Sequence, residues 1–229
     1  MCGAYGFSVK DMKAVYKRFT IVNELDDFQP RYNLRPGQMN PVVISHSPNR
    51  IARMFWGLIP AWAQEFKATK YSTINARVET VTEKPSFRKP LRQQRCLVPA
   101  TGFYEPDKIH YSKPPYPWHY FIVKDQPVYA FAGIYEVWTE KETGKQYYSY
   151  AIITTTPNAV VGKVHDRMPV ILHKEDEETW LNPDITEPEQ LIPLLKPYPV
   201  QDMEEWAVGD DARNPRNDYP ELIKPVTSA

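Results

Sequence analysis

Runs of aromatic and β-branched residues constrain the fold of this chain more than any other feature. Residues Trp118–Val123 and Val128–Trp138 are separated by the short polar segment Lys124–Pro127, and a third run, Tyr147–Thr154, follows a turn at Glu142–Lys145. Such residues favour strands, and short polar connections usually join antiparallel neighbours. The sequence therefore predicts an antiparallel hairpin from the first two runs and a further strand from the third.

The remaining elements are short. Strands are expected at Pro41–Ser45 and Arg50–Trp56, joined as a hairpin, and at Cys96–Ala100, Val170–Leu172 and Met203–Val208. The pattern Ser8-Val9-Lys10-Asp11 resembles a capping box and predicts a helix over about 8–19, whereas Arg31–Gly37 is typical of a turn. Two acidic helices are expected at Lys174–Leu181 and from Thr186. The sequence predicts one α+β domain, residues 1–229, built on an antiparallel, barrel-like sheet with peripheral helices.

Composition excludes several classes of protein. Two cysteines in 229 residues do not make a disulfide scaffold, and no Cys-x-x-Cys or His-x-x-x-His pair suggests a metal site, so no metal or cofactor is expected. The start lacks an apolar signal region and no stretch reaches the roughly 18 apolar residues of a membrane span. A monomer in the cytoplasm, associated with the nucleoid if bacterial, is the expectation.

The net charge of zero hides an uneven distribution. Residues 1–100 carry 16 Lys and Arg against 7 Asp and Glu, whereas residues 171–229 carry 5 against 14. The first hundred residues are therefore +9 and the last fifty-nine are −9. A basic half is compatible with a phosphate-binding face, although scattered surface lysines give the same sum.

Cys2 carries the most distinctive chemistry. A methionine before a small residue is generally removed, and removal of Met1 would leave a chain that begins with a 1,2-aminothiol. An α-amine with a pKa of about 8 beside a thiol with a pKa of about 8.5 can form a Schiff base with an aldehyde and then attack it. The alternative is an intracellular free thiol with no catalytic role.

Three polar residues lie in settings that suit proton transfer or orientation. Glu105 stands among aromatic residues at the end of an apolar strand, where burial would raise its pKa and make it a general acid; a solvated loop carboxylate is the alternative. His165 lies between a helix end and a buried strand and could transfer a proton, or it could be structural. Asn75, taken alone, is an ordinary turn or cap residue.

Taken together, the short motifs of the chain resemble the blocks of one family. They are Met1-Cys2-Gly3, Arg31-Tyr32-Asn33, Trp56-Gly57-Leu58-Ile59-Pro60, Asn75-Ala76-Arg77-Val78-Glu79-Thr80, Arg95-Cys96-Leu97-Val98-Pro99-Ala100 and Val164-His165-Asp166-Arg167-Met168-Pro169. No single block is specific, but their ordered combination is similar to the SRAP (SOS response-associated peptidase) family, the abasic-site-processing proteins of bacteria and eukaryotes. The similarity runs on to Pro220–Ile223.

The resemblance implies a function and a set of residues. It implies that Cys2 forms a covalent thiazolidine crosslink with an abasic site in single-stranded DNA, in a DNA-repair role linked to the SOS response. It also implies autolytic release of Met1, as by a protease, and possible crosslink reversal or strand cleavage by a lyase reaction. Active-site positions are matched by Cys2, Asn75, Glu105 and His165, and DNA-binding positions by Asn33, Pro36, Trp62, Arg77 and Arg167.

Two departures and two alternatives accompany this resemblance. The family usually has Arg where this chain has Ala4, and an aromatic residue where it has Pro106. The first departure puts a phosphate contact in doubt, and the second a packing partner of Glu105.

Class II glutamine amidotransferases also begin Met-Cys-Gly and use the cysteine as a nucleophile, although none of their other motifs is recognised here. The other alternative is a non-catalytic single-strand binder.

Overall fold

A closed barrel forms one half of the molecule. The computed structural model describes residues 2–45, 47–67 and 73–226. Within them β10, β4, β3, β6 and β9 pair in that order, and β9 pairs again with β10, which closes the sheet. The pairing of β10 with β4 is parallel and the others are antiparallel. The barrel strands are β3 Met39–Ile44, β4 Arg50–Trp56, β6 Arg95–Ala100, β9 Tyr129–Thr139 and β10 Gln146–Thr155.

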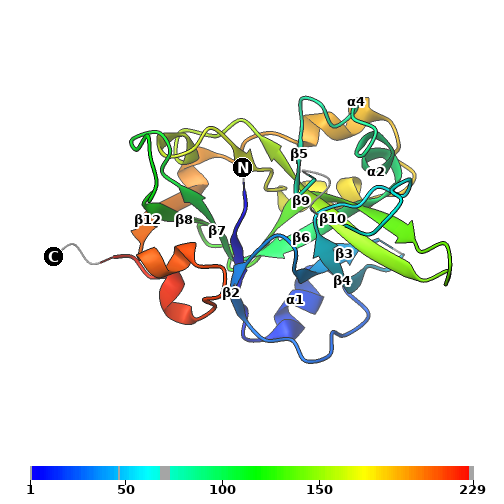
Figure 1. Ribbon diagram of the computed structural model, residues 1–229, viewed down its shortest axis with the longest axis horizontal. Helices are drawn as coiled ribbons and strands as arrows, with labels where there is room; N and C mark the ends of the chain where they lie inside the picture. The colour runs from blue at the N-terminus through cyan, green and yellow to red at the C-terminus, as the bar shows by residue number, and fades with distance from the viewer. Residues whose placement is uncertain (1, 46, 68–72, 227–229) are drawn as a thin grey trace.

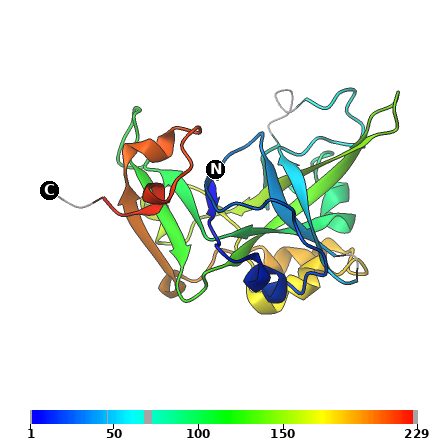
Figure 2. The same ribbon diagram turned by 90° about the horizontal axis from the view of Figure 1, so that it is seen from below.

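An antiparallel sheet of five strands forms the other half, in the order β12-β8-β7-β1-β2. Figures 1 and 2 show it beside the barrel, with β1 on the side where the two halves meet. Two short strands, β5 and β11, pair with β10 outside the closed barrel. These strands are β1 Tyr5–Phe7, β2 Arg31–Leu34, β5 Asn75–Arg77, β7 Gly102–Pro106, β8 Trp118–Val123, β11 Met168–Pro169 and β12 Met203–Val208.

The expected hairpin between the runs 118–123 and 128–138 is wrong. Both runs form strands, but β8 pairs with β7 and β12 whereas β9 pairs with β6 and β10. The connection between them therefore carries the chain from one sheet to the other. Strand propensity is a local property, whereas a strand's partner depends on which surfaces become buried together. The β3–β4 hairpin is confirmed, and the further strand expected at Tyr147–Thr154 is β10, which pairs with β9. Residues 31–34 form strand β2 instead of a turn.

The helices are short and lie around the sheets. α1 Met12–Arg18 begins after Asp11, whose carboxylate accepts a hydrogen bond from the Lys13 N–H at 2.9 Å, so the expected start at Ser8 is wrong. The hydroxyl of Ser8 is bonded instead to that of Thr101. The other α-helices are α2 Arg88–Gln93, α3 Glu177–Leu181 and α4 Pro188–Leu191. Among the described helices, none has the length and apolar character needed to cross a membrane.

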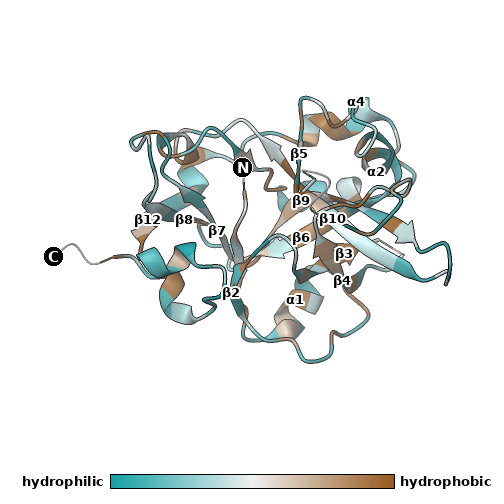
Figure 3. Cartoon of the chain, viewed as in Figure 1, coloured by the Kyte–Doolittle hydropathy of each residue, from teal (hydrophilic) through white to brown (hydrophobic). Residues whose placement is uncertain are grey.

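Buried aromatic residues fix β1 against the barrel. The Tyr5 ring packs edge-on against Trp56 and Phe131, with ring centroids 5.2 and 5.7 Å away, and its hydroxyl lies 2.9 Å from that of Tyr150. Burying a side chain of this size contributes about 1.5–3 kcal/mol. In Figure 3 the barrel strands β3 and β4 are largely hydrophobic. The position of Cys2, three residues before Tyr5, is therefore set by the core. The predicted single α+β domain with a barrel-like sheet and peripheral helices is confirmed.

Candidate active site

Cys2 is fully buried, near Asn75 of β5 on one side and Glu105 of β7 on the other. Its carbonyl oxygen accepts a hydrogen bond of 2.8 Å from Nδ2 of Asn75, and its Sγ lies 3.8 Å from the carbonyl oxygen of Ala4. Burial raises the pKa of the Cys2 thiol far above its usual value, and the nearby charge of Glu105 raises it further. The thiol is protonated at neutral pH, unlike the freely titrating thiol expected from the sequence. A base must therefore take its proton before the sulfur can attack.

Asn75 brings a second polar group to Cys2. It lies in β5, which runs parallel to β10, and its backbone is opposite Ile152. While Nδ2 holds the Cys2 carbonyl, Oδ1 is buried and accepts no hydrogen bond from any residue in the described ranges. A buried acceptor without a donor costs about 1–3 kcal/mol. Asn75 is therefore anchored through one end of its amide and offers the other end to an incoming donor.

Glu105 approaches from the opposite side, in β7. β7 pairs with β1, where the Tyr104 N–H donates to the Ala4 carbonyl at 3.0 Å, so Glu105 is brought next to the segment that carries Cys2. The carboxyl group is fully buried, and burial raises its pKa to about 7. Near neutral pH both protonation states are populated, which allows one group to donate and to accept a proton.

His165 completes the group at the end of the 3-10 helix Val161–Lys163. Its Nε2 lies 3.6 Å from Oε2 of Glu105, and its Nδ1 accepts a hydrogen bond of 3.1 Å from the Arg167 N–H. Asp166 Oδ1 is also 3.1 Å from Nδ1, but that carboxylate is 78% exposed and open to water. The hydrogen-bond network therefore assigns the neutral ring its proton on Nε2, the nitrogen that faces Glu105.

The distance between His165 and Glu105 is that of an ion pair, yet their pKa values point to a neutral pair. Burial lowers the pKa of His165 to about 4 and raises that of Glu105 to about 7. In a buried site, desolvation outweighs the attraction between the two charges. Between about pH 4 and pH 7 the neutral forms of both groups therefore predominate, and near pH 7 Glu105 populates its acid and ionised forms beside a neutral His165. His165 then acts as a neutral hydrogen-bond donor at physiological pH.

The residues expected to bind DNA divide into two groups, of which the first is at the surface. Arg77 is exposed and lies two residues beyond Asn75 in β5, on the same face of the strand. Trp62 is 60% exposed in the segment that follows β4. Pro36 is half-buried just after β2. These three side chains come from different segments of the chain.

The second group is buried and bonded within the protein. Asn33 is 1% exposed, and its Nδ2 donates to the carbonyl oxygens of Asn214 and Asn217 at 3.1 and 3.0 Å. Arg167 forms a bidentate ion pair with Glu79, in which Nη1 lies 2.6 Å from Oε1 and Nη2 lies 3.0 Å from Oε2. Nη2 of Arg167 also donates to the Thr154 carbonyl oxygen. In this structure both side chains hold segments of the protein in place.

Arg35 is a residue that the sequence analysis missed. Its Nε donates to Oδ1 of Asn33 at 2.7 Å, and its guanidinium lies over the ring of Trp118, 4.7 Å from the centroid. The spacing of two residues between Asn33 and Arg35 was the available signal, because alternate residues of a strand share a face.

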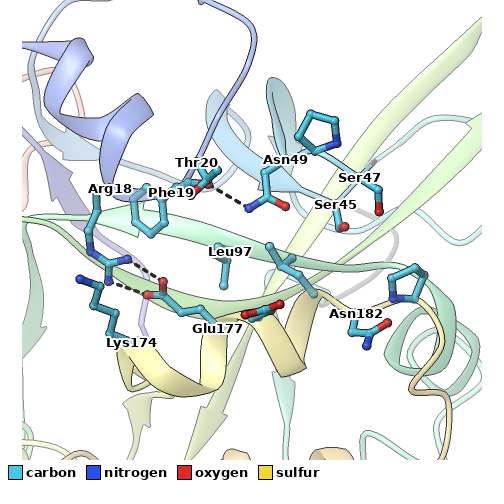
Figure 4. A pocket seen from close by; sticks show the side chains of 14 residues that line it. Arg18, Phe19, Thr20, Ser45, Ser47, Asn49, Leu97, Lys174, Glu177 and Asn182 are labelled. Carbon is cyan, nitrogen blue, oxygen red and sulfur yellow. Dashed lines mark hydrogen bonds and ion pairs between the residues drawn. The ribbon is translucent and has the colours of Figure 1, made fainter.

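A cavity of about 620 Å³ lies apart from these residues, between the end of α1, the β3–β4 turn and α3 (Figure 4). The Arg18–Glu177 ion pair, with a distance of 2.7 Å, spans one side, and Phe19 and Leu97 contribute apolar surface. None of the four candidate catalytic residues lines it. In the described part of the chain, no group of three or more His, Cys, Asp or Glu side chains is arranged to hold a metal ion.

Comparison with solved structures identifies the same fold in other proteins. The crystal structure of a protein from Bacteroides thetaiotaomicron aligns with a TM-score of 0.87 and 31% identity, covering 99% of this chain and all of that one. The crystal structure of a protein from Bordetella bronchiseptica aligns with a TM-score of 0.76 and 26% identity, covering 91% of this chain and 100% of that one.

Sequence comparison identifies relatives whose names describe a function. Abasic site processing protein YoqW of Bacillus subtilis (strain 168) is 43% identical over 223 residues, which cover 90% of this chain and 98% of that protein. Abasic site processing protein HMCES of Xenopus tropicalis is 30% identical over 228 residues, covering 88% of this chain and 68% of that protein. Residues 1–215 match the family described as SOS response associated peptidase (SRAP). The chain belongs to the SRAP family.

Proposed function

We propose that this protein processes abasic sites in single-stranded DNA by forming a covalent thiazolidine crosslink between the sugar and Cys2. The observation that carries the proposal is the convergence of Asn75, Glu105 and His165 on the segment that holds Cys2, with a buried carboxyl group whose pKa is about 7. The names of the relatives support abasic sites as the substrate.

The reaction begins with the aldehyde form of the abasic sugar. The α-amine of Cys2 adds to C1′ of this aldehyde, and loss of water gives an imine. In this imine the nitrogen is protonated. The sulfur then bonds to the carbon, the C=N π electrons pass to the nitrogen, which keeps its proton, and the thiol proton goes to a neighbouring base. The products are a five-membered thiazolidine ring and one water molecule. The ring traps an imine that would otherwise hydrolyse.

Each residue near Cys2 has a distinct role in these steps. Glu105 in its acid form protonates the departing hydroxyl, and in its base form accepts the proton of the buried thiol, so it ends as it began. His165, with its proton on Nε2, assists the opening of the sugar ring and the reverse reaction. The free Oδ1 of Asn75 accepts a hydrogen bond from the α-amine or the sugar hydroxyl.

Two further activities belong to the same proposal. Met1 lies outside the described residues, and we infer that it is released autolytically, because the reaction needs a free amine on Cys2. An imine that the thiol does not capture can undergo β-elimination, which would cut the strand as a lyase does. The protein acts as a monomer in this scheme, because all four reacting residues come from one chain.

The strand itself needs a phosphate track and a surface for the bases. In this scheme Arg77 contacts a phosphate, and the ring of Trp62 stacks on a base, which contributes on the order of 1–3 kcal/mol without sequence preference. The exposure of both side chains supports these roles. Pro36 would line the bend of the strand, whereas Asn33 and Arg167 act through the segments that they hold.

Intact mass spectrometry tests the proposal directly. The purified protein is measured alone and after mixing with a single-stranded oligonucleotide in which uracil-DNA glycosylase has produced one abasic site. We expect a mass without Met1 and a heat-stable adduct equal to protein plus oligonucleotide minus one water. An oligonucleotide that retains its uracil is the control. Absence of the adduct from a protein with a free Cys2 amine would overturn the proposal.

A further inference from the structure

Arg35 is half-buried, and within the part of the chain that the structure describes its charge has no carboxylate partner of the kind that Arg18 and Arg31 have. Its Nε donates to Asn33 and its Nη2 to the carbonyl oxygen of Ala212 at 2.5 Å. Its Nη1 donates no hydrogen bond, and no carboxylate pairs with it, within residues 2–45, 47–67 and 73–226. A guanidinium has five N–H donors, so several remain for a ligand.

Comparison with other arginines shows that this arrangement is not general in the fold. Arg18 is paired with Glu177, Arg31 with Asp218 and Arg167 with Glu79. Arg95 is buried without a carboxylate, but its three nitrogens donate to four backbone carbonyl oxygens. Among the described residues, Arg35 has neither a counter-ion nor a full set of acceptors.

The guanidinium of Arg35 is nevertheless held in a fixed position. It stacks on Trp118, and Asn33, which directs its Nε, is itself anchored by carbonyl groups of residues 214 and 217. Partial burial lowers the pKa of Arg35, but a guanidinium remains a cation at neutral pH. Half-burying an uncompensated charge is unfavourable unless an anion binds there.

The location of this cation is close to Cys2. Tyr5 of β1 is opposite Leu34 of β2, and Ala4 and Arg35 are the next residues beyond this pair, just outside the two strands. The Ala4 side chain is buried in a cluster with Tyr104, and Trp118, over which the Arg35 guanidinium lies, packs against the same cluster. Among the influences on the pKa of the Cys2 thiol, which burial dominates, the positive charge of Arg35 acts in the lowering direction.

We propose that Arg35 binds a phosphate of the DNA strand next to the sugar that reacts with Cys2. This assignment rests on the proposed function and adds to it the residue that positions the reacting nucleotide. The planar fork of a guanidinium matches two phosphate oxygens. Asn33 is then a positioning residue, because it orients the guanidinium without touching the DNA.

The geometry also predicts that residues 4 and 35 are interchangeable as the source of this cation. Directly opposed residues on neighbouring antiparallel strands have Cβ atoms about 4.5–5.5 Å apart and point to the same face. Positions 4 and 35 are each one residue beyond the opposed pair Tyr5 and Leu34. A long side chain from position 4 can therefore reach the space above Trp118 once Arg35 is shortened. The double variant Ala4→Arg/Arg35→Gln restores the cation from the other strand.

The experiment measures binding without the covalent reaction. Strands carry a tetrahydrofuran abasic analogue, which cannot open to an aldehyde, and neutral methylphosphonates replace the two flanking phosphates one at a time. We expect Arg35→Gln to weaken binding of the all-phosphate strand about tenfold or more, the scale of a charge-assisted hydrogen bond. At one of the two positions, the methylphosphonate should weaken binding by the wild-type protein about as much as the Arg35→Gln substitution does. The same methylphosphonate should not weaken binding by the Arg35→Gln variant any further. Arg53→Gln, which removes the charge of an exposed side chain on β4, is the matched control.

The outcomes separate the two proposals. An unchanged affinity in Arg35→Gln, or losses that add for both methylphosphonates, would overturn the role of Arg35, whether or not Cys2 forms its adduct. A second outcome is that the wild type forms no adduct, while the affinity losses from Arg35→Gln and from the methylphosphonate are not additive. That outcome would overturn the covalent chemistry but support the contact between Arg35 and the phosphate. Partial rescue by Ala4→Arg/Arg35→Gln is a further expected result. That variant places a long side chain in a buried position and can fail to fold. In that case the methylphosphonate comparison between the wild type and Arg35→Gln is the deciding test.

Discussion

His165 Nε2 and Glu105 Oε2 lie 3.6 Å apart in a position from which water is almost completely excluded. Burial moves the two pKa values in opposite directions, to about 4 for the imidazole and about 7 for the carboxyl group. The carboxyl group is therefore the member of the pair that titrates near neutral pH, and the imidazole is a neutral donor beside it.

Glu105→Gln should slow crosslink formation by about 10²-fold or more, because the amide keeps the shape but cannot exchange a proton. The wild-type rate should also show an inflection near pH 7 that the variant lacks. Quenched time courses on denaturing gels from pH 5.5 to 8.5 measure both. Glu205→Gln, which changes a partly exposed carboxylate on the same sheet, is the control. A folded Glu105→Gln protein with the wild-type rate would make Glu105 structural.

The same substitution should stabilise the protein at higher pH. The folded-state pKa of Glu105 is raised, so folding favours its protonated form, and its contribution to stability is lost as the pH rises from about 4.5 to 7. Above pH 7, Glu105→Gln should therefore raise the free energy of unfolding by on the order of 2–3 kcal/mol. Urea denaturation at pH 5 and pH 8 measures the difference. Equal effects at both values would contradict the raised pKa.

His165→Ala should slow crosslink formation less than Glu105→Gln does, and should slow release of the crosslink more. Because the pKa of His165 is lowered to about 4, its contribution should not change between pH 5.5 and 8. Release is measured by transfer of the protein from a labelled to an unlabelled abasic strand. His165→Gln, which keeps an N–H donor, should retain more activity than the alanine variant. Wild-type rates in both directions would remove His165 from the mechanism.

Variants at Cys2 separate the amine from the thiol. Cys2→Ser and Cys2→Ala keep the α-amine, so an imine should form and be trapped by borohydride, but no heat-stable adduct should appear. Strand cleavage is the expected fate of the uncaptured imine. A variant with an unprocessed extra residue before Cys2 keeps the thiol and should form no adduct. A stable crosslink from that blocked protein would favour simple thiol addition or an amidotransferase-like use of Cys2, which glutaminase activity would support.

Arg77→Ala should weaken binding to an undamaged single strand and reduce the salt dependence of the affinity. Loss of one phosphate contact lowers the slope of log K against log salt by about 0.7 for a single strand. Fluorescence anisotropy from 50 to 300 mM NaCl measures both quantities, with Arg53→Ala as the charge-matched control. If the two variants have the same slope, Arg77 is a surface charge outside the DNA path.

Local patterns were sufficient for several elements and insufficient for their pairing. The runs at 118–123 and 128–138 have strong strand propensity and form strands, but they enter different sheets. Likewise, Asp11 and not Ser8 caps α1, because the hydroxyl of Ser8 is bonded to Thr101, 93 residues away in the sequence. Interactions of this range have no signature in a short window of sequence.

The sequence by itself determined the family, through its ordered motifs, and the candidates for chemistry: a cysteine that can become N-terminal, a carboxylate among aromatic residues and a histidine beside a buried strand. Only the tertiary structure decided how these groups behave. Burial protonates the Cys2 thiol, brings the Glu105 pKa to about 7 and keeps His165 neutral. The pairing of Tyr5 in β1 with Leu34 in β2 brings the segment that carries Arg35 beside the segment that carries Cys2. Desolvation and strand register both arise from contacts between distant segments, which exist only once the chain has folded.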